Sequence, residues 1–172
     1  GWLLVIVLLA GALPVAAPAA PFASTPQADL WVPRGEIHAT AQQGGLLFIG
    51  GAFDGVLPSR GYGLSMDLDS FGVHSDFPAV DGAVYAVVGD DVGGFYLGGD
   101  FRHVGGVPRS SLAHVTASRE VDPWAPAPDG PVRALAFSRG VVYAAGQFTS
   151  IDQQNRSGLA AVDGGSGQLT AW

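Results

Sequence analysis

The chain has 172 residues and a formal net charge of −7, and all of its basic residues are arginine. The acidic balance disfavours a nucleic-acid partner, because like charge repels a phosphate backbone. The absence of cysteine excludes disulfides and thiolate chemistry. Glycine occurs 26 times and proline 12 times, which disfavours long helices and favours short strands joined by tight turns. We therefore predict an all-β protein.

The first residues have the pattern of an export signal. An unbroken apolar run at 2–10 is followed by Gly11, Pro14 and an alanine-rich stretch, so residues 1–23 are predicted to be a secretory signal peptide. The basic leader that normally precedes such a run is missing, and we expect the signal to be truncated at its start. The alternative is a membrane anchor retained over 2–20. Both interpretations predict that the rest of the chain is exported, either secreted or held at the cell surface.

One short motif recurs along the remaining chain. The sequence GGAF returns as GGDF and as AGQF, so that Phe53, Phe101 and Phe148 follow one another at a nearly constant step. Several other classes of residue keep the same step. They are an opening aliphatic residue (Ile37, Val84, Val132), an aliphatic residue after the phenylalanine (Val56, Val104, Ile151), an arginine (Arg60, Arg109, Arg156), a leucine (Leu64, Leu112, Leu159) and a closing aromatic (Phe77, Trp124, Trp172).

Each unit is predicted to form four short antiparallel strands. In the third unit the expected strands are 132–137, 141–146, 159–163 and 168–172, separated by turn signals such as SRG and GGSG. Four strands at a period of roughly 40 to 50 residues are typical of a β-propeller blade. The predicted blades are 35–80, 81–128 and 129–172, after a linker at 24–34.

The second strand of each unit carries two further signals. An aromatic residue stands in register at Phe48, Tyr96 and Tyr143. The glycine pair that ends the strand predicts a bulge or a close backbone approach, where a Cβ atom would clash.

The segments GGDFRHVGGVPRSSLAHV and AGQFTSIDQQNRSGLAAVD resemble the delta-60 repeat, a β-propeller repeat of exported bacterial proteins. The resemblance covers about 35–172, and kelch and quinoprotein propeller repeats are more distantly similar. The first unit departs from the pattern, with GVLPSR before its leucine and Phe77 where tryptophan is usual. The resemblance implies a propeller and an extracellular setting, and it implies no defined catalytic activity.

Three blades do not close a ring, because propellers carry about four to eight. We therefore expect these three to belong to a larger propeller, with further blades in the same natural chain. The segment 28–32, which contains Trp31, is predicted to supply the outermost strand of the last blade.

No residue is assigned to a catalytic, metal or cofactor site. The recurring arginines are interpreted as blade architecture, paired with a nearby carboxylate or stacked on an aromatic ring, and Trp124 and Trp172 as packing between blades. The spacing of the four histidines, His38, His74, His103 and His114, does not match a zinc site. The two acidic turns, Asp67 with Asp69 and Asp90 with Asp91, lack the pattern of a calcium-binding loop. A glycosylation sequon is present at Asn155.

The favoured function is a non-catalytic binding or scaffold module, whose partner is a glycan, a protein or a small molecule. The alternative is an exported pyrroloquinoline-quinone-type dehydrogenase, because LAAVDGGSGQLTAW is similar to the repeat of those enzymes. Neither quinone nor calcium ligands can be identified from the residues.

Overall fold

The computed structural model describes residues 35–43, 45–53, 61–70 and 72–171. The predicted export signal, the linker, Val56, Arg60 and Trp172 lie outside these ranges. The described residues contain strands and turns but no helix, so the all-β prediction is confirmed. Within the same ranges, no helix is long and apolar enough to cross a membrane.

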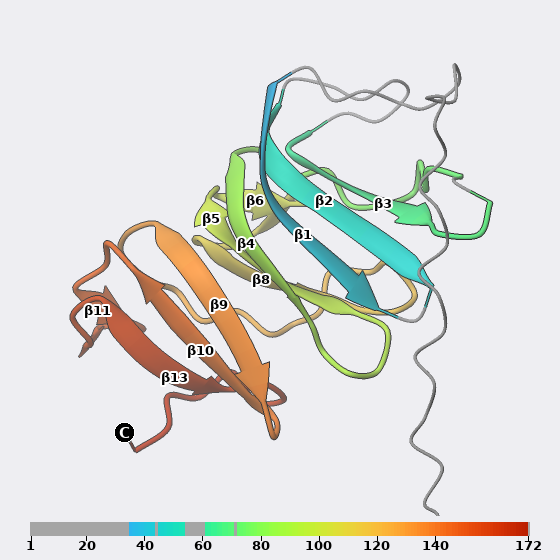
Figure 1. Cartoon of the computed structure of the whole chain (residues 1–172). Coiled ribbons are helices and arrows are strands. Elements are labelled where there is room, and N and C mark those ends of the chain that lie inside the picture. The colour runs from blue at the N-terminus through green and yellow to red at the C-terminus, as the bar shows by residue number, and fades with distance from the viewer. Residues whose placement is uncertain (1–34, 44, 54–60, 71, 172) are drawn as a thin grey trace, which may run out of the picture. The chain divides into compact units, whose positions relative to one another are not determined.

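Three antiparallel sheets of three strands follow one another along the chain (Figure 1). In each sheet the second strand lies in the middle. The first sheet is β1 (Gly35–Gln43), β2 (Leu46–Phe53) and β3 (Gly63–Asp67), the second is β4 (Ala83–Gly89), β5 (Phe95–Asp100) and β8 (Leu112–Val115), and the third is β9 (Val132–Ser138), β10 (Val141–Gly146) and β13 (Leu159–Asp163). Two small hairpins, β6 (His103–Val104) with β7 (Val107–Pro108) and β11 (Ser150–Ile151) with β12 (Gln154–Asn155), precede the last strand of the second and third sheets.

The prediction of four strands per unit is wrong for the described residues. In place of a fourth strand, each sheet has a single bridge beyond its third strand, at Met66–Val73, Val115–Val121 and Val162–Leu169. After the second of these bridges the chain continues as PWAPAP. Proline cannot donate to a strand ladder, so the pairing that begins at Val121 cannot extend.

At the glycine pairs the sequence predicts a bulge or a close backbone approach, and the structure has close contacts at both glycines of each pair. A Cβ at Gly98 would stand 2.8 Å from Cγ1 of Val132 in the third sheet, and one at Gly50 would stand 2.6 Å from Cγ1 of Val84 in the second. The second residue of each GG or AG motif is a glycine that faces a backbone carbonyl beside the bulge of the first strand of its sheet. These pairs are Gly51 with Glu36, Gly99 with Ala83 and Gly146 with Pro131.

The hydrophobic core lies between successive sheets. Phe48 of β2 packs with Val84 and Phe95 of the second sheet, and Phe48 and Phe95 rings lie 5.7 Å apart. Tyr96 and Leu112 of the second sheet pack in the same way with the apolar side chains of the third. Trp124 is buried in that second cluster, and its Nε1 donates to the Asp163 carbonyl at 2.9 Å. The prediction that Trp124 packs between units is therefore confirmed.

One position in the predicted register is wrong. Leu112 pairs with Gly98 and Leu159 pairs with Ala145, but the residue opposite Gly50 is Gly63 rather than Leu64. A shift of one residue turns a side chain to the other face of a sheet. Leu64 therefore packs with Phe53 and Met66 in a separate cluster, away from the second sheet.

Candidate functional site

A cavity of about 510 Å³ lies where the second sheet ends and the third begins. Its lining comes from the end of β5, the hairpin that follows it, and the turn that leads into β9. The lining residues are Asp100, Phe101, Arg102, His103, Ser110, Ser111, Pro128, Asp129, Gly130 and Pro131.

Two aspartates hold the hairpins at this end of the sheets. The Asp129 carboxylate accepts backbone N–H groups of Thr149 and Ser150 at 2.7 and 3.0 Å, and both of their hydroxyls at 2.6 and 3.1 Å. Asp81 likewise accepts the backbone N–H groups of Arg102 and His103, each at 2.8 Å. The sequence analysis assigns no role to either aspartate. Their shared place in the segments DGAV (81–84) and DGPV (129–132) is the signal of a common role.

The side chain of His103 is oriented by the first of these aspartates. Its Nδ1 lies 2.7 Å from Oδ2 of Asp81, and 48% of the side chain is exposed. Burial raises the pKa of Asp81, but hydrogen bonds from His103 and Arg102 outweigh it and hold the pKa below its usual value. The ring therefore reaches the cavity in a defined orientation.

Acid titration should release the Asp129 contact. Hydrogen bonds from Thr149 and Ser150 hold the pKa of Asp129 far below its usual 3.8, so this carboxylate stabilises the fold above that pH and loses the effect as pH falls. We expect Asp129→Asn to lower the urea midpoint at pH 7 and to flatten its decline between about pH 4 and pH 2. Urea denaturation at a series of pH values measures the midpoint and its decline. The control is Asp69→Asn, which removes the carboxylate of an exposed turn residue.

Four residues that line the cavity differ from their counterparts in the third unit. Asp100, Arg102, His103 and Ser111 stand where the third unit has Gln147, Thr149, Ser150 and Gly158. Among the described residues, the side chains of Asp100 and Arg102 have no hydrogen-bond partner, and both residues are exposed. Both charges are therefore available to a ligand.

Ser111 has the most unusual backbone of the lining residues. Its φ is 58°, in the left-handed region that favours glycine, and Gly158 has φ 73° at the same place in the third unit. The carbonyl of Ser111 accepts the N–H of Gly99 and that of Gly158 accepts the N–H of Gly146, so the second and third units share this backbone conformation. Ser111 is only 7% exposed, and no acceptor or donor in the described chain meets its hydroxyl.

The recurring arginines contact backbone carbonyls. Arg109 donates to the carbonyls of Pro108 and Asp122, each at 2.6 Å, and Arg156 donates to the carbonyl of Asn155 at 2.9 Å. Within the described residues, the predicted pairing with a carboxylate or an aromatic ring is therefore wrong for Arg109. For Arg156 it stays a prediction, because Trp172 of the same unit lies outside those residues. Asn155 of the sequon lies exposed in β12.

His114 lies in a different network, buried between the second and third sheets. Its Nε2 lies 2.9 Å from Oδ2 of Asp90, and its ring stacks on Tyr96 at 4.4 Å. The Tyr96 hydroxyl donates to the Gly164 carbonyl at 2.9 Å, and burial, with nearby carboxylates, raises the pKa of Tyr96 to about 12. With the His114 side chain only 11% exposed, this network serves packing between sheets.

The remaining candidates from the sequence are dispersed. His38 lies in β1, His74 follows β3, and neither joins His103 or His114. Asp67 and Asp90 accept backbone N–H groups of their own turns. Across the described ranges, no three histidine, aspartate or glutamate side chains are grouped to hold a metal ion.

Comparison of the sequence with protein-family models and with curated proteins gave no match in either case. Function therefore has to be argued from the cavity.

Proposed function

We propose that the chain is a non-catalytic binding module of an exported bacterial protein, built on three consecutive blades of a β-propeller with the delta-60 type of repeat. Three facts support the propeller: the sheets share one strand order, each first strand has a bulge opposite the glycine pair, and the sheets pack face to face. In a propeller, the faces that the three sheets leave open are covered by further blades of the same chain.

The observation that carries the binding proposal is Ser111. A serine in a left-handed conformation costs roughly 1 kcal/mol relative to glycine, and the third unit has glycine at this place. A strained residue with an unused hydroxyl in a cavity is what a ligand contact would require. The cavity also offers a carboxylate at Asp100 and a guanidinium at Arg102. We therefore assign the cavity to a small polar ligand, such as one unit of a glycan.

The Ser111→Gly variant should separate stability from binding. We expect it to gain about 1 kcal/mol of folding free energy, because glycine adopts the required φ without strain. The same change removes the hydroxyl and should weaken ligand binding several-fold. Urea denaturation measures the first effect. Fragment screening by ¹H–¹⁵N NMR measures the second effect, and bound fragments are expected to shift the signals of Ser111, Asp100 and His103.

Two results would contradict the assignment of the cavity as the binding site. One is that every bound fragment shifts NMR signals only of residues outside the cavity, and the other is that fragments bind Ser111→Gly as tightly as the natural chain. The non-catalytic part has its own test. After addition of pyrroloquinoline quinone and calcium, the protein should reduce no artificial electron acceptor. Dye reduction that depends on both additions would favour the dehydrogenase instead.

A further inference from the structure

The first strands of the three sheets share an irregularity outside the cavity. In each, one residue has no partner on the second strand, because the pairing register shifts around it. These bulged residues are His38 in β1, Tyr85 in β4 and Arg133 in β9, and each directly follows the opening aliphatic residue of its unit. A bulge re-aims the side chain that it carries and is often found beside a binding site.

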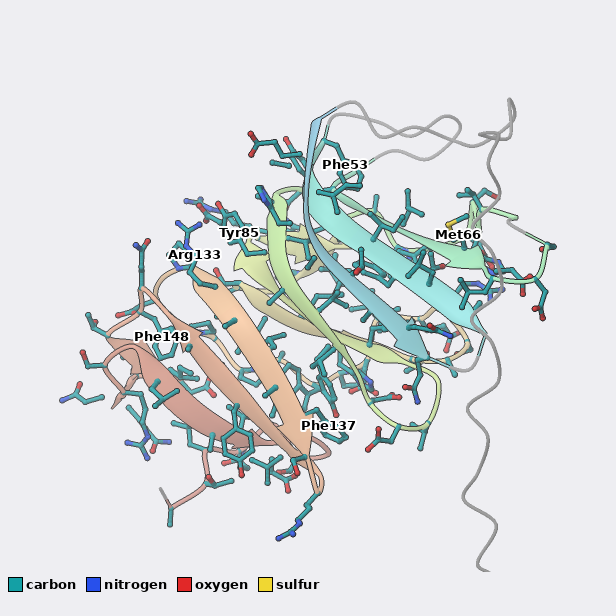
Figure 2. The ribbon with its side chains drawn as sticks, viewed as in Figure 1. Phe53, Met66, Tyr85, Arg133, Phe137 and Phe148 are labelled. Carbon is teal, nitrogen blue, oxygen red and sulfur yellow. The ribbon has the colours of Figure 1, made fainter. Side chains whose placement is uncertain are left out.

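Tyr85 contacts both of the other bulged side chains, which lie on the neighbouring sheets. The Arg133 guanidinium lies over the Tyr85 ring, with Cζ 4.1 Å from the ring centroid, and Figure 2 shows these two residues beside each other. The His38 ring lies 5.4 Å from the Tyr85 ring on the other neighbouring strand. We call this row of His38, Tyr85 and Arg133 the bulge row.

The fold requires the bulges but not these side chains. The residue before each bulge is aliphatic in all three units, and the residue opposite is always glycine. The bulged position itself carries a histidine, a tyrosine and an arginine. A fixed backbone feature with varied side chains is how a repeated scaffold can assemble one composite site.

Arg133 is held so that part of its guanidinium stays available. The guanidinium is restrained by its contact with the Tyr85 ring, and its Nη2 donates to Oε1 of Gln147 at 3.3 Å. Arg133 remains exposed, and its other N–H groups have no partner among the described residues. An arginine fixed in this way loses little conformational freedom when it binds a carboxylate with two parallel hydrogen bonds. At the other end of the row, Nε2 of His38 lies 4.0 Å from Oε2 of Glu36.

We propose that the bulge row binds a carboxylate group of a small ligand, with Arg133 as the principal contact. None of its residues lines the cavity of the previous section, so the site is separate from the one in the proposed function. The net charge of −7 opposes general attraction of anions, and binding must come from the local geometry.

Two sugars that differ at one carbon provide the test. Galacturonate carries a carboxylate where galactose has a hydroxymethyl group, and tricarballylate carries carboxylates without a sugar ring. By calorimetry we expect galacturonate to bind about tenfold more tightly than galactose. Tricarballylate binding as tightly as galacturonate would identify the carboxylate alone as the ligand, whereas tighter galacturonate binding would identify an acidic sugar. Equal affinities for galacturonate and galactose would overturn the proposal.

Arg133→Lys keeps the charge but removes the two-pronged donor, and it should lose most of the tenfold preference. The matched control is Arg139→Lys, in the turn between β9 and β10. Melting temperatures check that both variants fold, and an Arg133→Lys protein that folds and keeps the preference would overturn the proposal. Ser111→Gly should leave the preference for galacturonate over galactose unchanged. Loss of this preference in Arg133→Lys therefore tests the bulge row, and weaker fragment binding in Ser111→Gly tests the cavity.

Discussion

The Gly99→Ala variant is expected to lose about 3 kcal/mol of folding free energy. A Cβ at this position would overlap the carbonyl oxygen of Ala83, which the bulge in β4 turns toward the glycine. Backbone cannot move aside as a flexible side chain can, so β4 and β5 would have to separate. Urea denaturation followed by far-UV circular dichroism measures the loss.

Gly165→Ala is the matched control for this substitution. A Cβ at Gly165 would have only the Asp163 carboxylate nearby, at an ordinary 3.6 Å, and the change should stay within about 0.5 kcal/mol. Similar losses for Gly99 and Gly165 would mean that added backbone stiffness, rather than overlap with Ala83, causes the effect.

Leu112→Ala should cost about 3 kcal/mol, because it opens a cavity in the core between the second and third sheets. Leu112 is fully buried there and packs in one cluster with Val132 and Val142. Thermal and urea unfolding should both report the loss, with little change in the slope of the urea transition.

The third sheet provides the comparison for this prediction. Leu159 pairs with Ala145 as Leu112 pairs with Gly98, yet Leu159 is 46% exposed. Leu159→Ala should therefore cost less than about 1 kcal/mol. In a longer chain with further propeller blades, the proposed fold predicts that the cost at Leu159 rises toward that at Leu112. A cost that stays small there would contradict a covering blade.

The cavity and the bulge row were less accessible to sequence reasoning than the strands. Ser111 is one of many serines, and its left-handed backbone follows from hydrogen bonds with Phe101 and Gly99. His38, Tyr85 and Arg133 show no common chemistry, so a search for recurring residue types passes over them. Their shared position next to the opening aliphatic residue was the available signal. The residues of both proposed sites differ between units at fixed positions of the repeat.

Short-range features were determined by the sequence alone. The all-β class follows from composition, and the strands at 132–138 and 141–146 follow from local alternation and turn residues. The close approaches at Gly98 and Gly99 follow from the need for a residue without a Cβ. Each of these depends on a residue and its immediate neighbours.

Tertiary structure decided the features that depend on pairing register and on packing between sheets. Leu64 and Leu112 stand at the same place in the sequence pattern, but a register shift of one residue sends them to opposite faces. The contact of Tyr85 with Arg133 joins residues from successive units, and no local pattern encodes how two sheets meet. Packing of the sheets therefore brings together side chains that the sequence pattern leaves free to vary, and both proposed sites are built from such side chains.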